Sequence, residues 1–207
     1  MTIRPMNVRI DWKTDKLSDY DLSECIYLEI WHHTSKNFDF TNLPDAPNLK
    51  KIFIDSSNVK NLNGLDKYPF LEEVDMYYLR NLESLDGIEN MSQRIRFFSI
   101  ESARKLTDIT PVTKLKNIEG LGFINIGDID NLEFLYDMYE LKSLSFVGTK
   151  IICGDLAPVI NHFNIKCVGF DNRRHYSHKS KEVDLLLLKK EIMHQVILNE
   201  HSNQECK

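Results

Sequence analysis

The amino-acid sequence predicts an α/β repeat protein, in which one short structural unit is stacked many times and a helix follows the last unit. Three observations support this fold class. A six-residue apolar pattern recurs at a nearly constant interval, apolar residues at every third place follow it, and an amphipathic segment lies near the C-terminus. Neither the period of two of a strand nor the period of about 3.6 of a helix describes the whole chain.

The repeated unit, a hexad, has apolar residues at its first, fourth and sixth places. Seven copies begin 22 to 24 residues apart, at Cys25, Leu49, Leu71, Ile95, Ile118, Leu141 and Ile165. All 21 of these places are apolar in a chain that is 42% hydrophobic. Chance would produce this about once in 10⁸ trials for one fixed phase, so the period is a property of the fold.

Each hexad predicts a short strand, and the residues after it predict a tighter helix. In the third copy, apolar residues continue at every third place, at Leu79, Leu82, Leu85 and Ile88. A 3₁₀ helix has about three residues per turn, so residues three apart point to the same side. We therefore expect each repeat to contain a strand and a 3₁₀-like return arm whose apolar side faces the core.

This unit resembles the leucine-rich-repeat family, whose L-x-x-L-x-L pattern recurs every 20 to 29 residues. The second copy, LKKIFIDSSNVKNLNGLDKYP, is similar to the internalin-type class with repeats of roughly 22 residues. The resemblance covers residues 25–171 and implies a solenoid with one curved parallel β-sheet. It also implies a protein-binding role on the concave face, without catalysis.

One feature of the family is missing from the inner turns. The family usually has Asn or Cys three places after the strand, where the side chain caps buried backbone groups. Here those places hold His33, Ser57, Leu79, Ala103, Ile126, Thr149 and Arg173. Without an asparagine ladder, we expect irregular inner turns whose backbone groups are satisfied by water or by local turns.

The ends of a solenoid must be covered, because a terminal repeat otherwise exposes its apolar interior. We expect an N-terminal cap over residues 1–24, seven repeats over 25–171, and a polar linker with a C-terminal capping helix over 172–207. The helix should span 180–200 with Ser180 as its N-cap. Its apolar face would comprise Val183, Leu186, Leu187, Met193, Val196 and Ile197. The alternative is that this helix pairs with a second copy or with a partner.

Composition narrows the function classes. The net charge of −5 gives no basic footprint, so we expect neither nucleic acid nor a membrane as partner. The N-terminal segment lacks the apolar core of a signal peptide, and no run of about 18 apolar residues occurs, which predicts a cytoplasmic protein. The four cysteines follow no metal or disulfide spacing, and no nucleotide-binding glycine motif occurs, so no cofactor is expected.

The third, fifth and seventh places of each hexad should point outward from the concave sheet. In the first four repeats these places hold five acids, five aromatics, one lysine and one serine, whereas the last three repeats have mostly small residues there. We predict that the acids and aromatics bind a basic protein: Tyr27, Glu29, Trp31, Phe53, Asp55, Glu73, Asp75, Tyr77, Phe97 and Glu101. The alternative is that strand propensity selects the aromatics and that the acids only solvate the face.

A catalytic interpretation rests only on residues 171–179, DNRRHYSHK. His175 and His178 could share a helical face, but no further ligand completes a zinc site and no nucleophile or carboxylate is placed beside them. We favour a polar linker in which Arg173 and Arg174 form hydrogen bonds at the end of the solenoid or contact carboxylates of a partner. We therefore predict no catalytic and no metal-binding residues.

The leading hypothesis is a non-enzymatic binding protein. The chain is similar to small bacterial leucine-rich-repeat proteins, some of which resemble immunity proteins that neutralise a toxin. An acidic face would suit a basic toxin, such as a nuclease. The alternatives are a regulatory or effector-like adaptor and an enzyme that uses residues 171–179.

Overall fold

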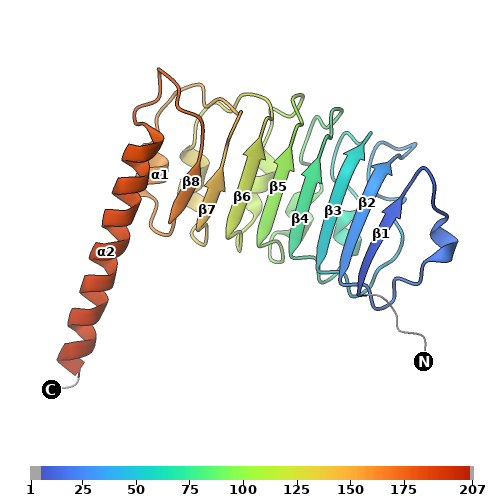
Figure 1. The fold of residues 1–207 in the computed structure, drawn as a ribbon, viewed down its shortest axis with the longest axis horizontal. Helices are drawn as coiled ribbons and strands as arrows, with labels where there is room; N and C mark the ends of the chain where they lie inside the picture. The colour runs from blue at the N-terminus through green and yellow to red at the C-terminus, as the bar shows by residue number, and fades with distance from the viewer. Residues whose placement is uncertain (1–5, 206–207) are drawn as a thin grey trace.

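Eight strands form one parallel sheet, in the order of the chain, in the computed structural model, which describes residues 6–205 (Figure 1). The strands are β1 Asn7–Asp11, β2 Tyr27–His33, β3 Lys51–Ser57, β4 Glu73–Tyr77, β5 Phe97–Glu101, β6 Gly120–Ile124, β7 Ser143–Ser145 and β8 Cys167–Gly169. Strands β2 to β8 fall on the seven hexads. The predicted solenoid with one parallel sheet is therefore confirmed.

Neighbouring strands pair at equivalent places of the hexad. The fourth-place residue Leu28 lies opposite Ile52, and Ile52 lies opposite Val74. Because side chains alternate along a strand, this register buries the fourth and sixth places of every repeat except the last, in which Val168 is half-buried. The third, fifth and seventh places consequently form rows on the opposite face of the sheet.

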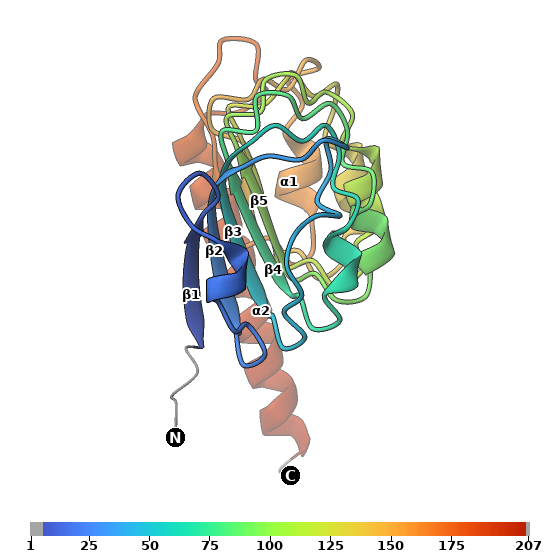
Figure 2. The same cartoon turned by 90° about the vertical axis from the view of Figure 1, so that its right-hand side faces the viewer.

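The return arms lie on the other side of the core from the sheet (Figure 2). Leu79, Leu82, Leu85 and Ile88 are all fully buried, which confirms the predicted apolar side of the arm. The arms contain the 3₁₀ helices Leu65–Lys67, Ile88–Met91, Thr110–Lys114 and Glu133–Asp137, and the last arm contains the short α-helix α1, Ala157–Asn161.

Glycine is required where two successive arms touch. Gly64 precedes the first of these 3₁₀ helices with φ +95°, and a Cβ atom built there would lie 2.5 Å from the backbone nitrogen of Thr41. Only glycine adopts this backbone conformation without strain and leaves room for the neighbouring chain. Stacking of the arms therefore uses direct backbone contact.

The inner turns are more regular than expected. The residue at the eighth place has a positive φ in six successive repeats, at His32, Ser56, Tyr78, Ser102, Asn125 and Gly148. In three of these repeats its N–H donates to a carbonyl of the next repeat, as from Tyr78 to Glu101 at 3.0 Å and from Ser102 to Ile124 at 2.9 Å. Backbone bonds between repeats thus take over part of the role of an asparagine ladder.

Side chains satisfy other backbone groups of the inner turns. Thr149 Oγ1 accepts from the N–H of Ile126 at 3.1 Å and donates to the carbonyl of Phe123 at 2.7 Å. The hydroxyl of Tyr176 accepts from the N–H of Ile151 at 3.0 Å. Capping is therefore shared among different side chains in different repeats.

The segment expected to form the N-terminal cap contributes a strand. β1 pairs in parallel with β2, and its Val8 and Ile10 are buried in the same core as the hexads. A short 3₁₀ helix, Leu17–Asp19, connects the two strands. Residues 1–5 of the expected cap lie outside the described residues.

The C-terminal helix α2 spans Ser180–Glu205 and contacts the end of the solenoid as far as His194. Val183 and Leu187 are buried, as predicted, and Leu186 is half-buried. The predicted burial of Met193 and Val196 is wrong, since they are 65% and 49% exposed. A helix of 26 residues is about 39 Å long, so it extends past the ends of the short strands beside it (Figure 1). The side chain of Ile197 lies outside the described part.

Ser180 is the first helical residue, so the prediction that it is the N-cap is wrong. The carbonyl of Lys179 accepts from the N–H of Val183 at 3.0 Å, and the carboxylate of Glu182 accepts from the N–H of Lys179 at 2.6 Å. Lys179 therefore occupies the N-cap place, with Glu182 in the position of a capping box.

Among the helices in the described part of the chain, none has the length and apolar character that a membrane span requires.

Candidate functional site: the concave face

All ten residues that the sequence singles out lie on β2 to β5 and point to the same face. The pairing register arranges them in three rows: Tyr27, Lys51, Glu73 and Phe97; Glu29, Phe53, Asp75 and Ser99; and Trp31, Asp55, Tyr77 and Glu101. Phe97 is 40% exposed and the other nine are half-buried. The structure thus brings the ten together, and their role in binding stays a prediction.

Three of the aromatic rings form a continuous line across β2 to β4. The ring centroids of Trp31 and Phe53 are 6.4 Å apart, and those of Phe53 and Tyr77 are 5.3 Å apart. Trp31 Nε1 donates to Glu29 Oε1 at 2.6 Å, and the guanidinium of Arg9 lies 4.4 Å from the Trp31 ring centroid. These contacts hold the indole in place before any partner arrives, which lowers the entropy lost on binding.

Two of the predicted acids are paired within the face. Lys51 Nζ lies 2.5 Å from Glu73 Oε1 and 3.4 Å from Asp75 Oδ2. Burial raises the pKa of Asp75, although the charge of Lys51 opposes this shift. Burial alone would lower the pKa of Lys51, but both acids outweigh it and raise that pKa. Lys51 therefore remains charged and compensates part of the acidic character that the sequence suggests.

The remaining acids are less compensated. Asp55 accepts a hydrogen bond from Ser56 Oγ at 2.8 Å, and Glu101 forms no ion pair with any residue that the structure describes. Burial, together with the charges of Glu101 and Asp75, raises the pKa of the Tyr77 hydroxyl. Asp55 and Glu101 therefore flank Tyr77 in one row of the sheet without an ion-pair partner among the described residues.

Sequence reasoning missed the contribution of β1 to this face. Asn7, Arg9 and Asp11 lie opposite Tyr27, Glu29 and Trp31 in the pairing register. The outward places of β1 to β5 therefore carry six acids and two cations, a net charge of −4 among the described residues. The alternation of Val8 and Ile10 was the available signal. The net charge of the face is the same as without β1, because Arg9 and Asp11 cancel each other.

The small residues of the later repeats form a hollow of about 370 Å³ beside the acidic and aromatic part. A Cβ atom at Gly120 would lie 2.8 Å from Cδ1 of Phe97, and one at Gly122 would lie 2.6 Å from Ser99 Oγ. Glycine thus lets the Phe97 ring lie over β6. The hollow gives room for a protruding element of a partner next to an exposed aromatic ring.

A second groove, which the sequence did not indicate, lies at the carboxyl ends of β2 to β4. It has a volume of about 660 Å³, and Trp31 and Asp55 border it together with Lys13, Tyr78 and Arg80. Tyr78 occupies the left-handed place of its inner turn with φ 55°. The groove extends the predicted face over the edge of the sheet and adds cationic side chains to its rim.

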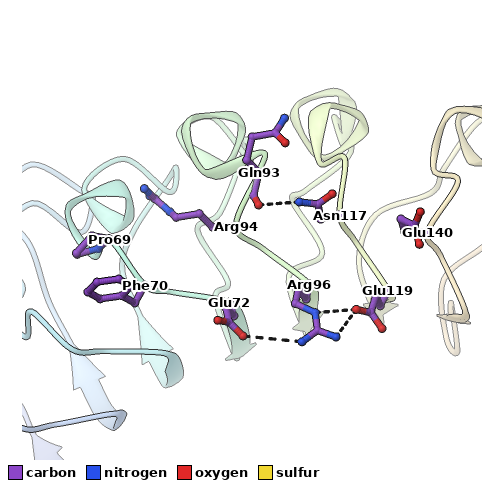
Figure 3. Close-up of a pocket in the computed structure, with 9 residues that line it drawn as sticks. All are labelled: Pro69, Phe70, Glu72, Gln93, Arg94, Arg96, Asn117, Glu119 and Glu140. Carbon is purple, nitrogen blue, oxygen red and sulfur yellow. Dashed lines mark hydrogen bonds and ion pairs between the residues drawn. The ribbon is translucent and has the colours of Figure 1, made fainter.

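A third pocket, of about 520 Å³, lies at the opposite edge, before the strands begin (Figure 3). Arg96 approaches Glu72 at 4.0 Å and binds Glu119 through Nε at 2.7 Å, and Lys142 Nζ lies 2.7 Å from Glu119. Hydrogen bonds from Lys142 and Arg96 lower the pKa of Glu119. These residues occupy the second place of successive hexads and form a charge ladder that links the repeats.

Residues 171–179 form turns, so the idea that His175 and His178 share a helical face is wrong. His175 Nε2 donates to the carbonyl of Ile151 at 2.9 Å, and a carboxylate oxygen of Asp171 accepts from the N–H of Gly148 at 2.8 Å. Asp171 and His175 thus bond the backbone of the sixth repeat. The expected role of Arg173 is not met, since its buried Nε has no hydrogen-bond partner in the described part of the chain. Within the described residues, no three potential metal ligands are grouped.

No protein-family model and no curated protein matches the chain. Among solved structures, an internalin (inlF) from Listeria monocytogenes is similar with a TM-score of 0.55 and 18% identity, over 73% of this chain and 43% of that chain. Internalin C2 (inlC2) from the same species aligns with a TM-score of 0.48 and 17% identity, over 72% of this chain and 73% of that chain. The chain thus spans less than half of the length of inlF. It has the internalin-like leucine-rich-repeat fold.

Proposed function

We propose that this chain is a non-catalytic scaffold that captures a basic protein on the concave face of β1 to β5. The observation that carries the proposal is the combination of a net charge of −4 with an ordered line of aromatic rings on one rigid sheet. Aromatic side chains are common anchors of protein interfaces, and charges around them accelerate association with a complementary partner. The hydrogen bonds of His175 and Tyr176 to the repeat backbone support a structural role for residues 171–179.

The specific function that we propose is immunity against a basic toxin. An immunity protein must bind quickly, because the toxin acts as soon as it is free, and opposite charges raise association rates. A small, preformed and acidic surface fits this requirement. A regulatory adaptor would use the same face, so the identity of the captured protein distinguishes the two functions.

The test begins with affinity capture from the native host and continues with binding kinetics of the purified partner. The variant Asp55→Lys/Glu101→Lys reverses two acids that form no ion pair with a described residue. It should slow association, and the effect should shrink at high salt because mobile ions screen exposed charges. Asp66→Lys/Asp137→Lys is the matched control, since both residues are exposed on the return arms.

Equal kinetics for the concave variant and the arm control, with both variants folded, would place the interface elsewhere on the chain. Protection of cells from the captured protein by co-expression would support immunity. A captured protein without toxicity would favour the adaptor.

A further inference from the structure

The C-terminal helix α2 carries a second apolar face that is exposed in the described chain. Leu185, Leu188, Ile192 and Val196 are 58%, 54%, 52% and 49% exposed, and we call these four residues the outer stripe. They recur at intervals of three, four and four residues, so they lie along one side of the helix. An exposed row of four large apolar side chains indicates an interaction surface.

The outer stripe lies opposite the side that caps the solenoid. Successive residues of a helix are rotated by about 100°, which places the stripe about half a turn from Val183 and Leu187. Those two residues are buried against the last repeat. The stripe therefore faces away from the repeats, and the second half of α2 extends past the sheet in both views (Figures 1 and 2).

The spacing of the stripe matches a short coiled coil. Leu185 and Ile192 take the a places of a heptad, and Leu188 takes the d place between them. The next d place is Gln195, and Val196 follows it at an e place. The stripe thus offers about two heptads, which fits a weak association with another helix.

The charges beside the stripe identify the partner and its direction. Asp184 and Glu191 take the g places on one flank, and Lys189 takes the e place on the other. Glu191 is paired with Lys166 at 3.0 Å, whereas Asp184 and Lys189 form no ion pair with any described residue. In a parallel pair of identical helices, a g residue lies beside the e residue of the next heptad of the other helix. Asp184 would then meet Lys189 of the second copy, twice by symmetry.

An antiparallel pair of identical helices would fit less well, because each flank then faces the same flank of the other copy and acids lie beside acids. We therefore propose that two copies of this chain associate through the outer stripes of α2, as a short parallel coiled coil. The solenoids lie on opposite sides of the helix pair, because the capping side of each helix, with Val183 and Leu187, points away from the other copy. The dimer thus presents two copies of the candidate binding face.

The first test measures association of the full chain by sedimentation velocity from about 5 to 500 µM, a range that covers weak homodimers. We expect a reversible monomer–dimer equilibrium. Leu188→Asp should raise the dissociation constant by at least about tenfold, because it places a carboxylate at the centre of the helix pair. Met193→Asp is the matched control, because Met193 is 65% exposed on the same helix but lies beside the stripe. It should leave the dissociation constant within about threefold.

The second test addresses direction. Asp184→Lys and Lys189→Asp should each weaken the dimer several-fold, and the double variant should restore it, because the swapped charges again attract across the pair. Single reversals that strengthen the dimer would overturn the parallel arrangement. A chain that stays monomeric up to 500 µM, or a dimer that survives Leu188→Asp, would overturn the proposal as a whole. Melting curves recorded well below the dissociation constant should be unchanged for all variants, since these side chains are exposed on the monomer.

Discussion

Lys190 binds the backbone of His162 at the junction between α2 and the last repeat. Its ammonium group donates to the carbonyl oxygen of His162 at 2.5 Å and to that of Ile160 at 3.4 Å. The imidazole of His162 is buried in the same junction and is bonded on both sides. The attachment of the cap thus depends on a lysine that is half-buried and on a histidine that must be neutral.

Stability should fall at mildly acidic pH because of His162. Its Nε2 donates to the carbonyl of Met138 at 3.0 Å, and its Nδ1 accepts from the N–H groups of Asn164 and Ile165, each at 3.2 Å. Protonation of Nδ1 would place its new N–H against these two N–H donors, so both hydrogen bonds would be lost. Burial lowers the pKa of His162, the hydrogen bond to Met138 opposes this, and the charge of Lys190 lowers it further.

A lowered pKa means that the unfolded chain binds the proton first as the pH falls. The contribution of His162 to the free energy of unfolding should therefore be complete above about pH 6.5. It should decrease below that pH, until His162 is protonated in the folded protein as well. Urea unfolding between pH 5 and pH 8 measures this. His162→Gln should flatten the profile, whereas the control His194→Gln, at an exposed position, should not. His33 should add to the loss of stability at acidic pH, since burial lowers its pKa too. An unchanged profile in His162→Gln would contradict the assignment.

The lysine of the junction should contribute measurably to stability. Lys190→Ala removes hydrogen bonds from an ammonium group to two carbonyls, and we expect a loss of about 1 to 2 kcal/mol in the free energy of unfolding. Lys181→Ala is the matched control on the same helix, since its side chain is exposed and it should change stability by less than about 0.5 kcal/mol. Equal effects of the two substitutions, measured by urea unfolding, would show that the junction bonds add nothing.

The core of the repeats should not tolerate a charge. Leu144 is buried at the fourth place of its hexad, so Leu144→Asp should cost more than about 4 kcal/mol and unfold the protein. Ser145, the next residue of β7, points to the concave face and is half-buried. The control Ser145→Asp should therefore retain cooperative melting. A folded Leu144→Asp variant with an unchanged melting temperature would contradict the register of β7.

The sequence predicted strands β2 to β8 because each repeat carries three apolar places, and stacking repeats must bury all of them. It did not predict β1, where the place equivalent to the first one is Pro5 and only Val8 and Ile10 match the hexad. Arg9 was missed with the strand. Its contact with Trp31 depends on pairing between strands, which a single segment does not reveal.

The limits at the C-terminus have a different cause. Helical periodicity predicts which residues share a face, but it does not tell how much surface lies beneath that face. Val183 and Leu187 are buried against the end of the solenoid, whereas Met193 points to another side of the helix and is exposed, although the next residue, His194, still contacts Phe163. The charge ladder of Glu72, Arg96 and Glu119 depends on contacts between neighbouring strands, which the sequence of a single repeat does not reveal.

The aromatic line should dominate the lifetime of the complex that we propose. Trp31 is held between Arg9, Glu29 and Phe53, so it loses little freedom on binding, and a truncated indole would leave a partner surface uncovered. Trp31→Ala should therefore mainly speed dissociation and cost about 2 kcal/mol, a roughly thirtyfold loss of affinity. Tyr77→Ala should act in the same direction.

The matched control is Tyr139→Ala, because Tyr139 is 71% exposed but belongs to a return arm and not to the concave face. Kinetics against the captured partner at two salt concentrations separate this effect from that of the acids. The aromatic variants should change the dissociation rate at both salts, whereas the charge variants should change the association rate mainly at low salt. If Tyr139→Ala weakens binding as much as Trp31→Ala does, with both variants folded, the partner binds the arms and the concave assignment is wrong.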